Sequence, residues 1–170
     1  MADTQVVVER WIGAPVEKVW EALTDLESAP RVLSGVQSIE VLTPGPFGEG
    51  TRWRETRKML GRTATEEMYV TASEEPSRCV VESDAQGAHY VSEFTLSPET
   101  DEEGGTTVRM AFTATPPSGG VAKVLLKLFG GLGAKAVRQA IERDLADVAA
   151  HVERPAPGVE PEGPDQPPKP

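Results

Sequence analysis

Residues 51–83, TRWRETRKMLGRTATEEMYVTASEEPSRCVVES, contain the pattern that is most informative about the fold. They divide into three short segments, 51–59, 62–73 and 78–83, separated by the turn Leu60-Gly61 and the polar stretch EEPS. Short β-rich segments joined by connections of a few residues are typical of antiparallel strands linked as hairpins. This stretch therefore predicts sequential antiparallel strands rather than strands that alternate with helices.

The same pattern continues on both sides of this stretch. It predicts four further strands, at 4–12, 36–42, 88–96 and 106–115. The register of the first strand stays open, because Val6, Val7 and Val8 are consecutive and either phase is apolar.

Helical spacing occurs near the two ends of the chain. Pro15 suits a first helical turn, and an apolar stripe follows it at Val16, Val19, Trp20 and Leu23. A second short helix is predicted from Glu27 to Leu33, although Pro30 constrains it. One or two short helices are therefore expected after the first strand.

A long C-terminal helix is predicted after Pro117. Its apolar face is formed by Val121, Leu125, Leu128, Leu132, Val137, Ile141, Leu145, Val148 and Val152. Gly130, Gly131 and Gly133 interrupt it, at a cost of about 1 kcal/mol each relative to alanine in a helix. We expect a kink or a break at these glycines.

These elements together predict an α+β fold, because the strands and helices are segregated along the chain. We expect a curved, seven-stranded antiparallel sheet wrapped around the long C-terminal helix, which is the element long enough to cover the apolar face. The folded domain is predicted at 1–153. Residues 154–170, RPAPGVEPEGPDQPPKP, are expected to be a disordered proline-rich tail, since they carry little apolar surface to bury.

Composition excludes several classes of function. The 170 residues carry 17 Lys and Arg against 27 Asp and Glu, a formal net charge of −10, which argues against nucleic-acid binding and against docking on anionic membranes. No apolar run has the roughly 20 residues that span a bilayer, and the start MADTQVVVER lacks the features of a signal peptide. We expect a cytoplasmic protein that is a monomer or a weak dimer.

Metal and nucleophile sites are also not expected. The single cysteine, Cys79, cannot form an internal disulfide, and with His89 and His151 it gives no metal-ligand spacing. No Ser-His-Asp arrangement is apparent, and GPFGEG lacks the Lys-Ser/Thr of a phosphate loop. We therefore predict no metal and no cofactor, and we expect the glycines of GPFGEG to let this loop flex over a cavity entrance.

Alternation along the strands predicts which side chains face the helix. Trp53, Glu55, Arg57 and Met59 share one phase, whereas their neighbours are mainly charged and should face water. By the same rule the inner face and the helix should provide a mostly apolar ligand site of Trp53, Arg57, Met59, Met68, Tyr90, Ser92, Phe94, Met110, Phe112, Leu125 and Phe129. Methionine and aromatic side chains suit an adaptable pocket, but they could equally fill a solid core.

Three stretches resemble a known superfamily: VVVERWIGAPVEKVWEALTDLESAPRVLSGVQSIEVL (6–42), GEGTRWRETRKMLGRTATEEMYVTASEEPSRCVVES (48–83) and GGTTVRMAFTATPPSGG (104–120). The chain is similar over about residues 4–152 to the START-like, or SRPBCC, superfamily, in its polyketide cyclase/dehydrase branch. The resemblance implies a helix-grip fold and a cavity for a small hydrophobic molecule. The superfamily includes aromatases and cyclases, lipid and hormone binders and chaperone-ATPase activators, and no shared catalytic signature assigns a catalytic residue here.

Glu55, Arg57 and Glu66 are the candidate catalytic residues. Three ionisable groups on predicted inner faces of adjacent strands are costly unless they are paired. They could form a structural ion-pair cluster beside the cavity mouth. Alternatively, Arg57 could orient a ligand carbonyl or carboxylate while a carboxylate with a raised pKa moves a proton.

Three functions remain open from the sequence. The first is binding of a polyketide-, lipid- or isoprenoid-like molecule. The second is a cofactor-independent polyketide cyclase, aromatase or dehydratase, which needs substrate folding, a proton donor and an acceptor. The third is a protein-interaction module resembling the chaperone-ATPase activators.

Overall fold

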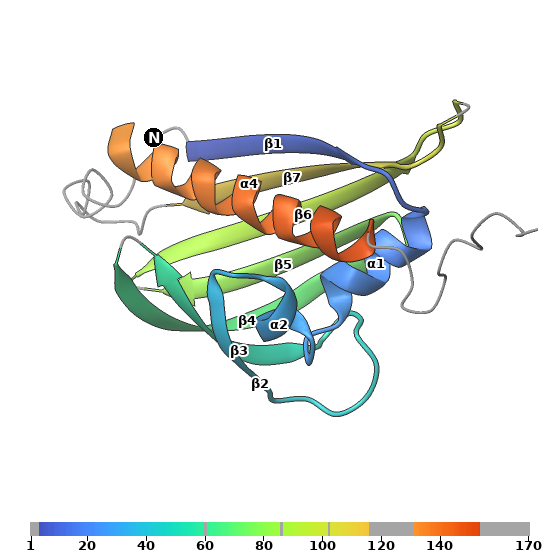
Figure 1. Ribbon diagram of the computed structural model, residues 1–170. Coiled ribbons are helices and arrows are strands. Elements are labelled where there is room, and N and C mark those ends of the chain that lie inside the picture. Colours follow the sequence, from blue (N-terminus) through green and yellow to red (C-terminus); the bar gives the residue numbers. More distant parts are fainter. Residues whose placement is uncertain (1–3, 60, 86, 102, 116–130, 154–170) are drawn as a thin grey trace, which may run out of the picture.

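The structure is a computed structural model of the chain and describes residues 4–59, 61–85, 87–101, 103–115 and 131–153 (Figure 1). The described residues form seven strands and three helices. The strands are β1 (Thr4–Ile12), β2 (Val36–Val41), β3 (Arg52–Met59), β4 (Arg62–Glu74), β5 (Arg78–Ala85), β6 (Ala88–Pro98) and β7 (Thr106–Thr115). The helices are α1 (Val16–Thr24), α2 (Ala29–Val32) and α4 (Gly131–Val152).

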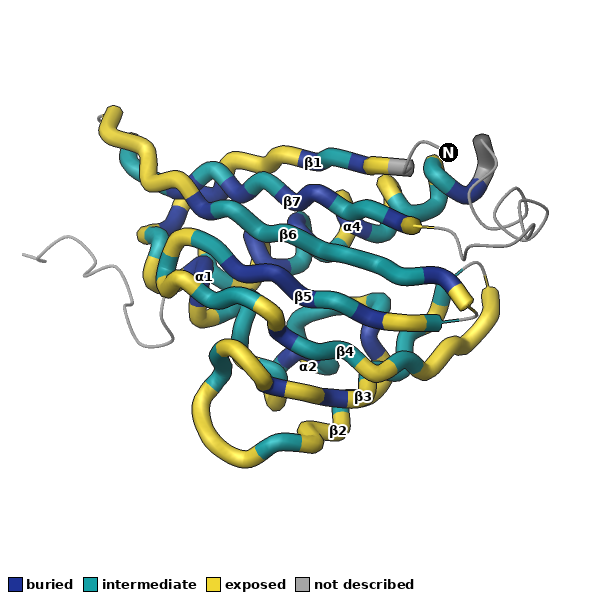
Figure 2. The backbone as a smooth tube through the Cα atoms, turned by 180° about the vertical axis from the view of Figure 1, so that it is seen from behind, coloured by how far each residue is buried: buried dark blue, intermediate teal, exposed yellow. Residues whose placement is uncertain are grey.

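The strands form one antiparallel sheet in the order β1-β7-β6-β5-β4-β3-β2. Strands β2 to β7 are therefore sequential neighbours, and β1 joins the far edge beside β7. Helix α4 crosses one face of the sheet, and α1 and α2 lie on the same side (Figure 1). Seen from behind, the opposite face has no helix over it in the described part of the chain (Figure 2). The predicted α+β fold with a helix gripped by a seven-stranded sheet is confirmed.

Pairing with β7 settles the register of β1. Val6 lies opposite Phe112 and Val8 opposite Met110, and both valines are buried against the helix side. The carbonyl oxygen of Val7 instead accepts a hydrogen bond of 3.0 Å from Arg138 Nη1 of α4. This contact satisfies one main-chain acceptor on the free edge of the sheet, where a strand has no further partner.

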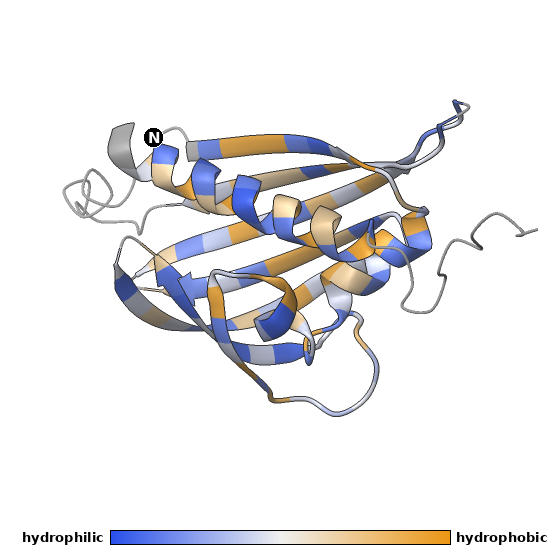
Figure 3. Ribbon diagram, viewed as in Figure 1, coloured by the Kyte–Doolittle hydropathy of each residue, from blue (hydrophilic) through white to orange (hydrophobic). Residues whose placement is uncertain are grey.

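The core is divided into two clusters of unequal size. The larger one packs α4, through Ile141, Leu145 and Val148, against α1, β1 and β7. The smaller one consists of Trp53, Val70 and Val81 on β3, β4 and β5. Apolar residues alternate with polar ones along the strands (Figure 3), and the buried residues of α4 belong to the larger cluster. Helix α4 is thus held by apolar packing mainly on the β1–β7 side of the sheet.

The helices correspond to the predicted segments with two qualifications. The second short helix is a single turn, since α2 covers only Ala29–Val32. The part of the predicted C-terminal helix at 121–130 lies outside the described residues, and α4 begins at Gly131, within the run of glycines. None of the helices described is long and apolar enough to cross a membrane.

Candidate functional site

Strands β3 and β4 place the predicted charged residues on the side that faces α4. Trp53 pairs with Met68, and Glu55 lies directly opposite Glu66. Two carboxylates directly opposite each other on antiparallel strands repel, so this pair is unfavourable unless a cation or a proton compensates it. Farther along, Arg57 lies opposite Ala64, which is exposed, so this end of β4 is not covered by the core.

Arg57 supplies the compensating charge and connects the sheet to the helix. Its Nε donates to Glu55 Oε1 at 2.9 Å, and its Nη1 donates to Asp144 Oδ2 of α4 at 2.7 Å. The three side chains are 21%, 15% and 24% exposed. They form a largely buried, charge-assisted network that spans the interior from β3 to α4.

The titration behaviour of this network follows from burial and from the neighbouring charges. Burial opposes the charge of Arg57, but the carboxylates of Asp144 and Glu55 outweigh it and raise the pKa of the guanidinium. Burial raises the pKa of Asp144, and Arg57 only partly reverses this. Burial also raises the pKa of Glu66, and the negative charge of Glu55 adds to it. Burial thus favours the neutral form of both carboxyls, Glu66 and Asp144, whereas the nearby Arg57 favours the ionised form of both.

Beside the charged network lies an aromatic pair. Tyr90 of β6 and Phe112 of β7 stack with ring centroids 5.8 Å apart and an interplanar angle of 24°. Burial and the nearby Glu66 carboxylate raise the pKa of the Tyr90 phenol, so this tyrosine stays protonated as a hydrogen-bond donor. The apolar and the charged parts of the site therefore adjoin one another.

The predicted ligand residues differ in how deeply they lie. Trp53 and Met110 are buried in the smaller and larger core clusters. The half-buried ones are Met59, Met68, Tyr90, Ser92, Phe94 and Phe112. Leu125 and Phe129 lie outside the described residues. The half-buried set, Met59 apart, lies on the middle strands of the sheet, on the face that α4 crosses.

Two residues that the sequence analysis missed complete this region. Asp144 lies next to Leu145 and three residues after Ile141, so it borders the apolar stripe of α4, a position at which a carboxylate needs a partner. Phe47 is the one aromatic side chain in the Gly- and Pro-rich loop 43–50. Its ring lies 6.4 Å from that of Trp20 and 6.3 Å from that of Trp53, so it connects α1 to the inner face of β3.

Loop 43–50 makes hydrogen bonds at its end, and the expected flexing of its glycines stays a prediction. Gly48 N donates to Thr51 Oγ1 at 3.0 Å, and Gly50 N donates to the Val70 carbonyl oxygen at 2.9 Å. Gly45 and Gly50 have φ angles of 98° and 89°, which glycine adopts without strain.

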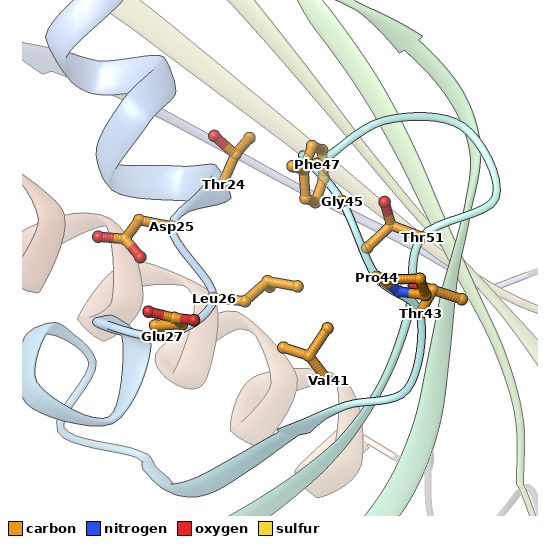
Figure 4. Close-up of a pocket in the computed structure, with 10 residues that line it drawn as sticks. All are labelled: Thr24, Asp25, Leu26, Glu27, Val41, Thr43, Pro44, Gly45, Phe47 and Thr51. Atoms are coloured by element: carbon orange, nitrogen blue, oxygen red, sulfur yellow. The ribbon is translucent and has the colours of Figure 1, made fainter.

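A surface groove of about 350 Å³ lies between this loop and the α1–α2 connection (Figure 4). It is lined by Thr24, Asp25, Leu26, Glu27, Val41, Thr43, Pro44, Gly45, Phe47 and Thr51. None of the predicted ligand residues lines it. Phe47 lines the groove and also contacts Trp53, so this side chain lies between the groove and the inner face of β3.

The remaining candidates lie elsewhere. His89 is on the outer face, where Nδ1 contacts Asp84 Oδ1 and Nε2 contacts Glu82 Oε2, both at 2.8 Å. Burial raises the pKa of the Cys79 thiol to about 12, so this cysteine is not a ready thiolate. Within the described residues no group of three or more His, Cys, Asp and Glu is placed to hold a metal ion.

Comparison with known proteins agrees with this architecture. A family model described as polyketide cyclase/dehydrase and lipid transport matches residues 3–153. No match was found among functionally curated proteins.

Among solved structures, the di-domain aromatase/cyclase BexL of the BE-7585A biosynthetic pathway superposes with a TM-score of 0.73 at 20% identity, over 90% of this chain and 51% of BexL. The chain thus spans about half the length of that di-domain protein. The Zhui aromatase/cyclase of Streptomyces sp. R1128 gives 0.73 at 17% identity, over 90% and 95% of the two chains. A START superfamily protein of Mycobacterium smegmatis gives 0.68 at 13%, over 89% and 98%.

Proposed function

Because the chain belongs to the polyketide cyclase/dehydrase and lipid transport family of START-like proteins, we propose that it binds a small hydrophobic molecule between the inner face of the sheet and α4. Family membership implies either hydrophobic ligand binding or cyclase activity. A polyketide-, lipid- or isoprenoid-like ligand is the class we favour, and Trp53, Met68, Tyr90, Phe94 and Phe112 are the side chains that would contact it.

The observation that carries this proposal is the incomplete burial of the inner face. In a tightly packed core the apolar side chains beneath a helix are almost fully inaccessible. Met68, Tyr90, Phe94 and Phe112 are only half-buried, although they lie on the face that α4 crosses. Apolar surface that is left accessible there would gain free energy by covering a ligand, at about 25 cal/mol per Å².

The division of the core supports the same proposal. Helix α4 packs through apolar side chains against α1, β1 and β7, whereas it reaches β3 through the polar pair Arg57–Asp144. A ligand on the inner face beneath α4 would therefore border the main core cluster, against which Phe94 and Phe112 pack, without replacing its buried residues.

Thermal shift and native mass spectrometry with naringenin, oleic acid and farnesol would test the proposal. We expect at least one of them to form a 1:1 complex and to raise the melting temperature. Phe112→Ala should weaken that complex about tenfold or more, because a buried aromatic contact contributes over 1 kcal/mol. Thr113→Ala, the next position on β7 with its side chain on the other face, is the matched control and should leave the affinity unchanged. The proposal would be contradicted if none of the three molecules formed a complex and if protein purified from its native host also carried no bound ligand.

A second candidate function is a cofactor-independent cyclase or dehydratase. The specific observation in its favour is Glu66, a carboxyl with a raised pKa on the inner face beside the Tyr90 phenol. A carboxyl next to a phenol can supply a proton acceptor and a hydrogen-bond donor for an enolisable carbonyl. Arg57 would act as an electrostatic stabiliser of the enolate only if it gave up part of its bonding to Glu55 or Asp144.

Incubation with a poly-β-ketone thioester would distinguish the two functions. An enzyme would convert the thioester to a cyclic product, of the same mass after aldol cyclisation alone or lighter by one water after dehydration, and Glu66→Gln would slow its formation while leaving binding of the thioester largely intact. A binding protein would retain the thioester unchanged.

A further inference from the structure

The inner side of the site carries more acid than base. Among the described residues, the half-buried charged side chains between the inner faces of β3 and β4 and helix α4 are Glu55, Glu66, Asp144 and Arg57. Three carboxylates thus face one guanidinium. When all four groups are ionised, the interior has an excess of two negative charges.

Arg57 cannot neutralise this excess. Its hydrogen bonds go to Glu55 and Asp144, at 2.9 Å and 2.7 Å. Glu66 lies across the strand pair from Glu55 and opposes it with a like charge. Among the described residues Glu66 makes no direct ion pair, and the charge of Arg57 offsets its burial and its repulsion from Glu55 only in part.

A second group in the network also lacks a donor. Asp144 Oδ1 is buried and has no hydrogen-bond partner in the described part of the structure. A buried acceptor left without a donor costs about 1–3 kcal/mol. The interior therefore lacks hydrogen-bond donors and positive charge rather than acceptors.

The apolar part of the site is next to the uncompensated carboxylate. The Glu66 carboxylate is near enough to the Tyr90 phenol to influence its titration, and Tyr90 stacks on Phe112. A ligand that covers these rings would bring its polar group close to Glu66. Aromatic faces themselves attract cations, which favours the same kind of polar group.

From this charge distribution we infer that the site selects hydrophobic molecules that carry a basic amine, with the ammonium group at Glu66, and that it discriminates against hydrophobic carboxylates. The inference rests on the proposed function, since it concerns the polar end of the ligand in that same interior site. A neutral hydroxyl, which can donate a hydrogen bond but brings no charge, should bind with intermediate affinity.

Three probes of nearly the same shape test this inference on the full 170-residue chain. They are 1-naphthylmethylamine, 1-naphthalenemethanol and 1-naphthoate, which are cationic, neutral and anionic near pH 7. Isothermal titration should give affinities in that order, with the amine at least about tenfold tighter than the carboxylate, equivalent to about 1.4 kcal/mol. Equal or tighter binding of the carboxylate would overturn the inference and leave the proposed function standing. Binding of none of the three would overturn the inference, and it would refute the proposed function as well only if naringenin, oleic acid and farnesol also formed no complex.

The variants Glu66→Gln and Glu67→Gln separate the interior charge from the charge of the whole protein. Both remove one negative charge from β4, but Glu67 lies on the outer face, where it pairs with Arg52 at 2.8 Å. We expect Glu66→Gln to reduce the preference for the amine about fivefold or more, and Glu67→Gln to leave it unchanged. Equal losses in the two variants, or a preference that disappears between about 0.15 M and 0.5 M salt, would show non-specific surface attraction and overturn the inference. Glu66→Gln removes an uncompensated charge, so the variant should fold, which far-UV circular dichroism checks.

Discussion

At the scale of single residues, Arg57 is the side chain on which the interior depends most. It holds Glu55 and Asp144, which belong to different elements, and all three side chains are largely buried. A guanidinium suits this position because its fork can donate to two carboxylates at once, which a lysine ammonium does less well. The sequence allowed a structural and a ligand-binding role for Arg57, and the two ion pairs favour the structural one.

Arg57→Met should therefore destabilise the protein. The variant keeps the aliphatic bulk but leaves two buried carboxylates unpaired, a loss of about 2–4 kcal/mol in the free energy of unfolding. Urea denaturation followed by circular dichroism would measure it. The double variant Arg57→Met/Asp144→Leu should recover part of the loss, because it removes one of the unpaired charges. Wild-type stability and wild-type ligand affinity in Arg57→Met would exclude both roles.

His89 should make stability depend on pH through the outer face. Its hydrogen bonds with Asp84 and Glu82, opposed in part by burial, raise its pKa above the ordinary 6.5. Since the folded-state pKa is raised, the stabilisation is fully present below about pH 6.5 and is lost as the pH rises through the folded-state value. Unfolding free energies of the wild type and of His89→Gln should therefore differ at about pH 5.5 and converge at alkaline pH. A constant difference across this range would contradict the ion pairing of His89.

At the level of elements, α1 packs on the rest of the molecule through two buried residues, Val19 and Trp20. Trp20 is 5% exposed, and its ring meets that of Phe47 at an interplanar angle of 87°. The helix thereby holds the loop 43–50 above Trp53. Edge-to-face pairs of this kind add about 0.5–1.5 kcal/mol to the gain from burial.

Trp20→Ala should cost about 3–5 kcal/mol, because it leaves a large cavity beneath the helix. A fall in the melting temperature by differential scanning calorimetry would measure the effect. Glu21→Ala, an exposed position on the same helix, is the control and should change stability little. An unchanged melting temperature in Trp20→Ala would mean that α1 presents another face to the core.

The sequence predicts which face of an element is buried only where apolar and polar residues alternate locally. Alternation in β3 separates Trp53, Glu55 and Arg57 from charged neighbours, and their inner placement follows from it. Val6 to Val8 carry no such contrast, so only pairing with Met110 and Phe112 decides their phase. The roles of Asp144 and Phe47 depend on contacts that are distant in the sequence. Asp144 pairs with Arg57, 87 positions earlier, and Phe47 packs on Trp20, 27 positions earlier, and no local pattern encodes such contacts.

At the scale of the whole molecule, the folded domain should need nothing beyond Glu153. Glu153 Oε1 accepts a hydrogen bond of 2.8 Å from Gly13 N, which joins the end of α4 to the β1–α1 turn. Deletion of residues 154–170 should therefore leave the melting temperature and ligand binding unchanged, as the composition of that segment predicts. Deletion of 153–170 also removes this contact and should lower stability slightly. A large loss in the shorter deletion would show that the proline-rich segment packs on the domain.

A hydrophobic ligand is proposed to bind inside the molecule, between α4 and the inner face of the sheet. Amide chemical-shift mapping of the ¹⁵N-labelled full chain, titrated with whichever naphthalene probe binds most tightly, would locate the ligand. We expect saturable shifts that are largest at Met68, Tyr90, Phe94 and Phe112, together with residues around Glu66 on β4. Shifts confined to the surface groove at Leu26, Val41 and Phe47, or no saturable shifts at all, would contradict this expectation.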